Sequence, residues 1–267
     1  MKVMKRRAQR GFTLIELMFA MALLGFILIF SLTVISQLIS TYNRGLSLVQ
    51  VNQAIRHFDN DLTKALGSVG AGSVTINFFN AAGDRVADPT DPSVVAGSIC
   101  LKDSVYVWNL GNAVADDGQP FFGYAGSAAP FRLLRINTND IGYCEAKVDS
   151  ERNYRRFPRG QQAMQAAQGT QEATVSLLGS QSMVMYANIS TLGNASANQG
   201  KLMNVHFVLS SAGADFAPAW VDENGDEKPE NAPLDLAVHH LTCVNTRNRS
   251  EFCSFGEFNS IIYMRGQ

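Results

Sequence analysis

One apolar run near the N-terminus limits what this chain can fold into. From Leu17 to Ile35 only Gly25, Ser31 and Thr33 interrupt the apolar side chains. At ~1.5 Å per residue, a helix over this run covers roughly 28 Å, close to the thickness of a bilayer core. The positive charges that precede it are Lys2, Lys5, Arg6, Arg7 and Arg10. Because such charges stay in the cytoplasm, we expect a single-pass membrane protein whose C-terminal part is exported.

A cleaved secretory signal is one alternative for a basic segment followed by an apolar run. Such a signal has a shorter apolar core and a small-residue cleavage site of the Ala-x-Ala type. Here the run is longer, and the segment that follows it, SQLISTYNRGLSLVQVNQAIRHF, offers no site of that type. A plain uncleaved anchor stays open on these grounds.

Glu16 distinguishes a plain membrane anchor from a helix that packs beside other helices in the membrane. A carboxylate in hydrocarbon costs a few kcal/mol unless it is paired or neutralised, and a lone anchor has no reason to carry one. If the chain were cut after Gly11, the new amine would stand on Phe12, four residues before Glu16. The amine of one helix could then meet the Glu16 of a neighbouring helix inside the membrane.

The stretch RGFTLIELMFAMALLG resembles the class III signal peptide of the type IV pilin superfamily. The resemblance covers residues 6 to 30. It implies that prepilin peptidase cuts after Gly11 and methylates Phe12, and that Glu16 is the glutamate at the fifth mature position that serves assembly. It also implies partnership with other major and minor pilins and with an inner-membrane assembly platform. One departure is that no proline occurs before Pro89, so the helix is expected to be less kinked than that of a major pilin.

The helix is expected to continue well beyond the membrane. No proline interrupts residues 12 to 66. A single apolar stripe of helical spacing follows the membrane run, formed by Leu48, Val51, Ile55, Phe58, Leu62 and Leu66. Such a stripe indicates that the second half of the helix docks on a globular domain, with an exposed coiled-coil stalk as the alternative.

Beyond Gly67 the pattern changes to short β-branched and aromatic segments between loops rich in Gly, Asp, Asn and Pro. The segments are VTINFF, SVYVWN, TVSLL, SMVMYA, LMNVHFVLS and SIIYM. They predict an α+β fold, with a long N-terminal helix packed on an antiparallel β-sheet head as in pilins. The expected organisation is a leader at 1–11, a transmembrane and filament-core helix at 12–41, an amphipathic helix at 42–66 and a β-rich head at 67–267.

Four cysteines fall in the exported part, at Cys100, Cys144, Cys243 and Cys253. No CxxC pair is present, which argues against zinc or thioredoxin chemistry, and an even number in an exported domain favours disulfides. Three connectivities are possible, with free buried cysteines as a further alternative. Pairing nearest neighbours in sequence gives Cys100–Cys144 and Cys243–Cys253. The second pair resembles the disulfide-bounded loop near the C-terminus of many pilins.

Two polar segments are weak candidates for ligand binding. Asp222, Asn224 and Asp226 have the first spacings of a calcium loop, but Glu227 stands where an EF-hand needs glycine, so a polar turn is favoured. No other metal or cofactor is implied.

The second segment, ERNYRRFPRG, sets four arginines among aromatic residues, namely Arg152, Arg155, Arg156 and Arg159. Arginine with aromatic residues could hold a nucleic acid. Acidic residues flank the cluster and the net charge of the whole chain is −1, so a partner or pilin–pilin surface is favoured over DNA.

No Walker loop, GxGxxG, GxSxG or HExxH motif occurs, so the sequence offers no catalytic constellation. We therefore expect a minor pilin of a type IV pilus. Its long β-rich region and C-terminal cysteine pair are loosely similar to the PilW group. The expected role is in pilus assembly, initiation or the tip, first with the head in the periplasm and later at the cell surface. The alternatives are a minor pseudopilin of a type II secretion system, similar to the J component, and a DNA-uptake pilin of a competence apparatus.

Overall fold

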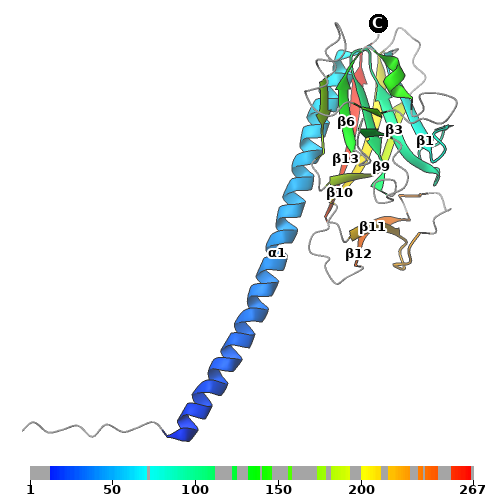
Figure 1. Ribbon diagram of the computed structural model, residues 1–267. Coiled ribbons are helices and arrows are strands. Elements are labelled where there is room, and N and C mark those ends of the chain that lie inside the picture. The colour runs from blue at the N-terminus through cyan, green and yellow to red at the C-terminus, as the bar shows by residue number, and fades with distance from the viewer. Residues whose placement is uncertain are drawn as a thin grey trace, which may run out of the picture. The chain divides into compact units, whose positions relative to one another are not determined.

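The computed structural model describes residues 13–70, 73–111, 122–124, 132–138, 140–145, 156–157, 173–178, 182–192, 200–211, 216–228, 234–236, 238–245 and 254–265. It is an α+β structure in which one long helix precedes antiparallel sheets (Figure 1). The chain divides into two compact units, residues 1–43 and residues 44–267.

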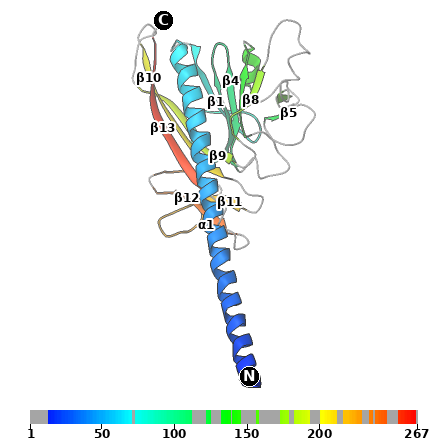
Figure 2. The same cartoon turned by 90° about the vertical axis from the view of Figure 1, so that its left-hand side faces the viewer.

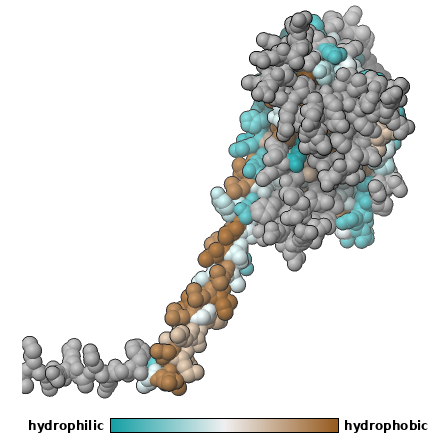
Figure 3. All heavy atoms as spheres, viewed as in Figure 1, coloured by the Kyte–Doolittle hydropathy of each residue, from teal (hydrophilic) through white to brown (hydrophobic). Residues whose placement is uncertain are grey.

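The helix α1 spans Leu14–Ser68. Its first half, in the N-terminal unit, is long and apolar enough to cross a membrane, and no residue of its most apolar stretch is buried. Figure 3 shows apolar residues at the surface along this half of α1. A protein in water would hide such a surface, so its exposure on all sides suits a lipid environment.

The second half of α1 belongs to the head, and its apolar stripe is buried there. Val51, Phe58, Leu62 and Leu66 are almost completely buried in the head's main core. The predicted stripe needs one correction, because Leu48 is exposed and Ser47 is buried instead. Ser47 lies four residues before Val51 and so continues the buried face, whereas Leu48 is rotated away from it.

The strands of the head are β1 Thr75–Asn80, β2 Arg85–Val86, β3 Val94–Cys100, β4 Val105–Asn109, β5 Gly123–Tyr124, β6 Leu133–Asn137, β7 Arg156–Phe157, β8 Ala173–Ser176, β9 Ser182–Leu192, β10 Lys201–Ser211, β11 Phe216–Val221, β12 His240–Asn245 and β13 Phe255–Met264. A short 3-10 helix, η2, covers Ile141–Cys144.

These strands form a six-stranded sheet of order β2-β1-β3-β4-β6-β8 and a three-stranded sheet of order β13-β10-β9. The described strands of both sheets pair antiparallel. Two smaller pairs, β11-β12 and β5-β7, complete the described strands. An isolated bridge between Leu110 and Val184 connects the two larger sheets.

The second half of α1 packs against both larger sheets. Figure 2 shows it between β10 and β13 on one side and β1 and β4 on the other. Aromatic rings in edge contact join these elements: Phe207 lies 4.8 Å from Phe58 and 5.2 Å from Trp108, centroid to centroid. Such contacts contribute ~1 kcal/mol each beyond the area they bury.

Strand β4 is central to the head, because its residues are buried on both faces. Tyr106 and Trp108 face the helix, while Val105 and Val107 belong to a second core on the opposite face of the sheet. Gly97 of β3 lies opposite Trp108, and a side chain at Gly97 would overlap the indole ring. The glycine is therefore required for the tryptophan to lie flat across the sheet.

Candidate functional site

The N-terminal turn of α1 holds Glu16 in a defined position. The backbone N–H and the hydroxyl of Thr13 both donate to Oε2 of Glu16 at 2.9 Å, and the N–H of Glu16 lies 3.4 Å from Oγ1 of Thr13. The carbonyl of Thr13 accepts the first helical hydrogen bond, from Leu17. This reciprocal arrangement is a capping box, in which a side chain at each end satisfies free N–H groups of the first turn.

The capping box leaves half of the carboxylate available. Both bonds from Thr13 end on Oε2, and Oε1 of Glu16 makes no hydrogen bond with any described residue. Thr13 would be the second residue after a cut behind Gly11, so its amide N–H would survive processing. The cap fixes the glutamate side chain and leaves one oxygen for an additional donor.

The remaining polar side chains of the apolar run are satisfied within the helix. The hydroxyl of Ser31 donates to the carbonyl of Ile27, and that of Thr33 donates to the carbonyl of Phe30. Such back-bonding hides a hydroxyl from lipid at little cost. Glu16 is therefore the polar side chain of this segment that keeps an oxygen for an outside partner.

Gly11 and Phe12, the predicted cleavage and methylation residues, lie outside the described residues. The helix begins two residues beyond Phe12, at Leu14.

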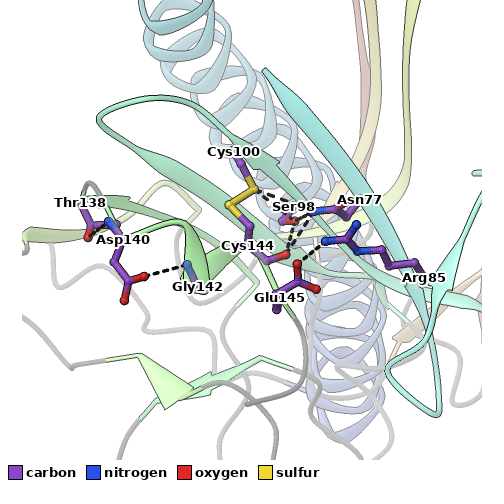
Figure 4. The surroundings of a disulfide bond; sticks show 9 residues. All are labelled: Asn77, Arg85, Ser98, Cys100, Thr138, Asp140, Gly142, Cys144 and Glu145. Carbon is purple, nitrogen blue, oxygen red and sulfur yellow. Dashed lines mark hydrogen bonds and ion pairs between the residues drawn. A yellow bond between two sulfur atoms is a disulfide. The ribbon is translucent and has the colours of Figure 1, made fainter. Parts of the chain in front are cut away.

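The structure joins Cys100 of β3 to Cys144 of η2 by a disulfide, with Cα atoms 5.8 Å apart. Nearest-neighbour pairing had predicted this link. Both cysteines are buried, and the bridge closes a 44-residue separation (Figure 4). On chain entropy alone it contributes about 4 kcal/mol.

A buried polar network supports the disulfide. The carbonyl of Cys144 accepts hydrogen bonds from Nδ2 of Asn77 at 3.2 Å and from Oγ of Ser98 at 3.0 Å. An exposed ion pair between Arg85 and Glu145 lies beside it (Figure 4). No local pattern in the sequence predicts this network, because Asn77, Ser98 and Cys144 are far apart along the chain.

The second predicted disulfide falls partly outside the structure. Cys243 lies in β12, opposite Pro218 of β11, and Cys253 lies outside the described residues. The pairing of these two cysteines stays a prediction.

Most of the arginine cluster also falls outside the structure. Arg152, Arg155 and Arg159 are not among the described residues, and Arg156 is placed only by the backbone of β7, where it pairs with Gly123. The role of the arginine cluster as a partner or DNA surface stays a prediction.

The candidate calcium residues form a tight turn after β11. Oδ1 of Asp222 accepts the N–H groups of Asp226 at 3.0 Å and Asn224 at 2.8 Å. The bond from Asp226, and then that from Asn224, lower the pKa of Asp222. Gly225 has a φ of 84°, a left-handed conformation that glycine adopts without strain. Within the described ranges, no group of three or more His, Cys, Asp or Glu side chains is arranged to hold a metal ion.

A polar cluster that the sequence did not reveal holds α1 on the six-stranded sheet. Asp61 of α1 accepts a hydrogen bond of 2.7 Å from the hydroxyl of Tyr106 in β4 and one of 2.5 Å from Nη1 of Arg135 in β6. Burial, and then the bond to Asp61, raise the pKa of Tyr106 far above its ordinary value. The cluster therefore favours a neutral tyrosine between an aspartate and an arginine.

Comparison with known families gives one match, which covers residues 6–32 and is described as a prokaryotic N-terminal methylation motif. No curated protein and no solved structure matches the chain. The motif spans the second half of the basic leader, Gly11, Phe12 and the first part of α1, and the head lies beyond it.

The motif, the apolar helix and the antiparallel sheets together support a protein of the type IV pilin-like class, which includes the pseudopilins. A motif of this kind implies processing by a peptidase and assembly with other pilins, and it fits membrane anchoring. It also suggests a structural rather than an enzymatic protein.

Proposed function

We propose that this protein is a minor pilin of a type IV pilus, most like the PilW group, that acts in pilus assembly, initiation or at the tip. The observation that carries the proposal is the methylation motif at residues 6–32 on a helix that continues into the core of a large β-rich head. The size of the head favours a minor pilin, because major pilins are usually shorter.

The mechanism begins with cleavage after Gly11 and methylation of Phe12. Before assembly, α1 anchors the chain in the inner membrane with the head in the periplasm. The new amine of a neighbouring pilin then binds Oε1 of Glu16, the oxygen that the bonds from Thr13 leave available. Within hydrocarbon such a charge pair is favoured because each partner alone would be costly.

Deletion of the gene in its own host tests the proposal. The deletion should reduce or abolish surface pili, and the wild-type gene should restore them. A Gly11→Val variant should not restore them, because a bulky side chain obstructs the scissile bond. Normal piliation together with loss of extracellular hydrolases would reject the pilus and favour a secretion pseudopilin. Normal filaments with loss of DNA uptake alone would favour a competence pilin.

A further inference from the structure

Two buried side chains from neighbouring strands donate hydrogen bonds to the carbonyl of Cys144, the residue that ends η2. Asn77 of β1 pairs with Ser98 of β3, and both side chains point at this carbonyl (Figure 4). The oxygen lies 3.2 Å from Nδ2 of Asn77 and 3.0 Å from Oγ of Ser98. Neither residue is more than 5 % exposed. We call them the Asn77–Ser98 pair.

The Asn77–Ser98 pair favours a docked η2 whether or not the disulfide has formed. The sheet face around the pair is apolar, since Phe79 of β1 and Val105 of β4 belong to the second core. A donor that is buried in such a core without its acceptor destabilises the fold. The bonds to the carbonyl of Cys144 involve neither sulfur atom, so the reduced chain can form them as well.

The other end of η2 is positioned separately. Asp140 accepts the N–H of Gly142 at 2.7 Å, and its own N–H donates to Oγ1 of Thr138 at 3.0 Å. The N–H of Thr138 donates to the carbonyl of Asp103, between β3 and β4. The start of η2 is therefore attached to the six-stranded sheet. The Asn77–Ser98 pair determines where the end of η2, with the Cys144 side chain, lies.

The same pair borders the sulfur with which Cys144 bonds. Ser98 and Cys100 are two residues apart on β3, so their side chains share one face of the sheet. Nδ2 of Asn77 lies 3.9 Å from Sγ of Cys100, within range of a weak hydrogen bond to sulfur. A Cys144 carbonyl held by Asn77 and Ser98 therefore keeps the Cys144 side chain beside Cys100.

Chain length alone does not select this disulfide. Cys100 and Cys144 are 44 residues apart, and about twice as many separate Cys144 from Cys243. The probability of closing a loop falls only as about the 3/2 power of its length. An unfolded chain would therefore form the Cys100–Cys144 bond about as often as the bonds that join either cysteine to Cys243 or Cys253, taken together.

We propose that Asn77 and Ser98 are positioning residues that select Cys144 as the disulfide partner of Cys100. They hold the reduced Cys144 against β3, and a disulfide oxidant then closes the bridge. One cysteine thiolate attacks the oxidant and displaces a thiolate, and the other attacks the resulting mixed disulfide and displaces the second. Two electrons and two protons pass to the oxidant, which leaves as two thiols. The proposal does not depend on the role of the protein in assembly.

Oxidative refolding of the full-length chain in detergent tests this selection. The chain is reduced and unfolded in denaturant, transferred to oxidised and reduced glutathione, and alkylated at short times. Non-reducing peptide mapping then gives the pairing ratio, defined as the yield of Cys100–Cys144 over the summed yield of bonds from either cysteine to Cys243 or Cys253.

The test variants are Ser98→Ala and Asn77→Leu, each of which removes a donor to the carbonyl of Cys144. The matched control is Asn109→Leu. Asn109 is a fully buried asparagine of β4, and its side chain exchanges hydrogen bonds with the backbone of Phe122 instead. This control loses a buried amide of the same sheet without touching η2.

We expect a wild-type pairing ratio well above one. Each test variant should lower the ratio roughly fivefold, the equivalent of one hydrogen bond, and Asn109→Leu should leave it unchanged. A wild-type ratio near one, or equal ratios in the wild type and Ser98→Ala, would overturn the proposal, as would an equal fall in Asn109→Leu. Ser98→Ala removes only a hydroxyl, so it decides the question even if Asn77→Leu does not fold.

Discussion

The hydroxyl of Tyr106 donates a hydrogen bond of 2.7 Å to the carboxylate of Asp61, and this bond joins the central strand of the head to the helix that anchors it. Arg135 binds the other oxygen of the same carboxylate and lies 6.0 Å from the centre of the Tyr106 ring. Apolar contacts are not directional, whereas a three-residue polar cluster with set donors and acceptors has one arrangement. Asp61 therefore fixes the position of α1 on the head.

Tyr106→Phe should lower the free energy of unfolding of the head by about 1 kcal/mol at neutral pH, the usual net value of one hydrogen bond. The ring stays in place and only the hydroxyl is lost. Chemical denaturation of the detergent-solubilised chain, followed by the fluorescence of its two tryptophans, Trp108 and Trp220, measures the change. A variant as stable as the wild type would show that the bond does not hold the helix.

The same pair predicts an alkaline pH dependence. The pKa of Tyr106 is raised in the folded head above its ordinary value of about 10, so folding favours the neutral hydroxyl. Its contribution is complete below pH ~10 and is lost as the pH rises above that value, because only the unfolded tyrosine then ionises. Between about pH 9 and 11 the wild type should lose stability more steeply than Tyr106→Phe. If the stability of the wild type and that of Tyr106→Phe fell equally over this pH range, the raised pKa of Tyr106 would not contribute to folding.

Glu16 has two roles that a pair of substitutions separates. Glu16→Gln preserves a capping-box residue but removes the charge, whereas Glu16→Ala removes both. If Oε1 binds a neighbour's amine, both variants should insert in the membrane and both should lose co-purification with other pilins. If Glu16→Gln co-purified normally with other pilins and Glu16→Ala did not, helix capping and not charge pairing would be the role of Glu16 in assembly.

A second disulfide is expected in the head beside the Cys100–Cys144 bridge. Non-reducing peptide mapping should recover the Cys100–Cys144 link and a Cys243–Cys253 link. Cys100→Ser should cost about 4 kcal/mol of stability, because it opens a loop that the bridge closes. A link between Cys100 and Cys243 would refute the nearest-neighbour pairing while leaving export intact.

The arginine cluster is expected to be a partner surface. Charge reversal at Arg155 and Arg156 should reduce piliation or pilin binding, and the purified protein should bind DNA weakly. Strong, salt-sensitive DNA binding that the double variant loses would instead identify a nucleic-acid site, because released counterions drive such binding.

Periodicity and residue type predicted the parts of this fold that depend on local pattern. The helix shows an apolar run and then a stripe. Each of the six predicted segments overlaps a strand that the structure forms. Strand β3 was missed, because VVAGSIC has neither alternation nor aromatic residues, and burial on both faces removes the need for alternation. Strand β11 was also missed. It contains Pro218, and proline argues against a strand except at the edge of a sheet.

The capping box depends on a local sequence pattern, whereas the polar clusters of the head do not. The Thr13–Glu16 capping box is visible in the sequence as T-x-x-E, since both of its residues lie within one helical turn. The contacts between Asp61 and Arg135 and between Asn77 and Cys144 cross 74 and 67 residues. No local pattern encodes such contacts, because they depend on how the sheets pair.

Assembly through Glu16 requires cleavage after Gly11, and intact mass spectrometry of the protein extracted from host membranes shows whether that cleavage occurs. We expect a chain that begins at Phe12, lacks residues 1 to 11 and carries one additional methyl group. A full-length chain in cells with an active prepilin peptidase, or a mature chain that begins at any other residue, would contradict it.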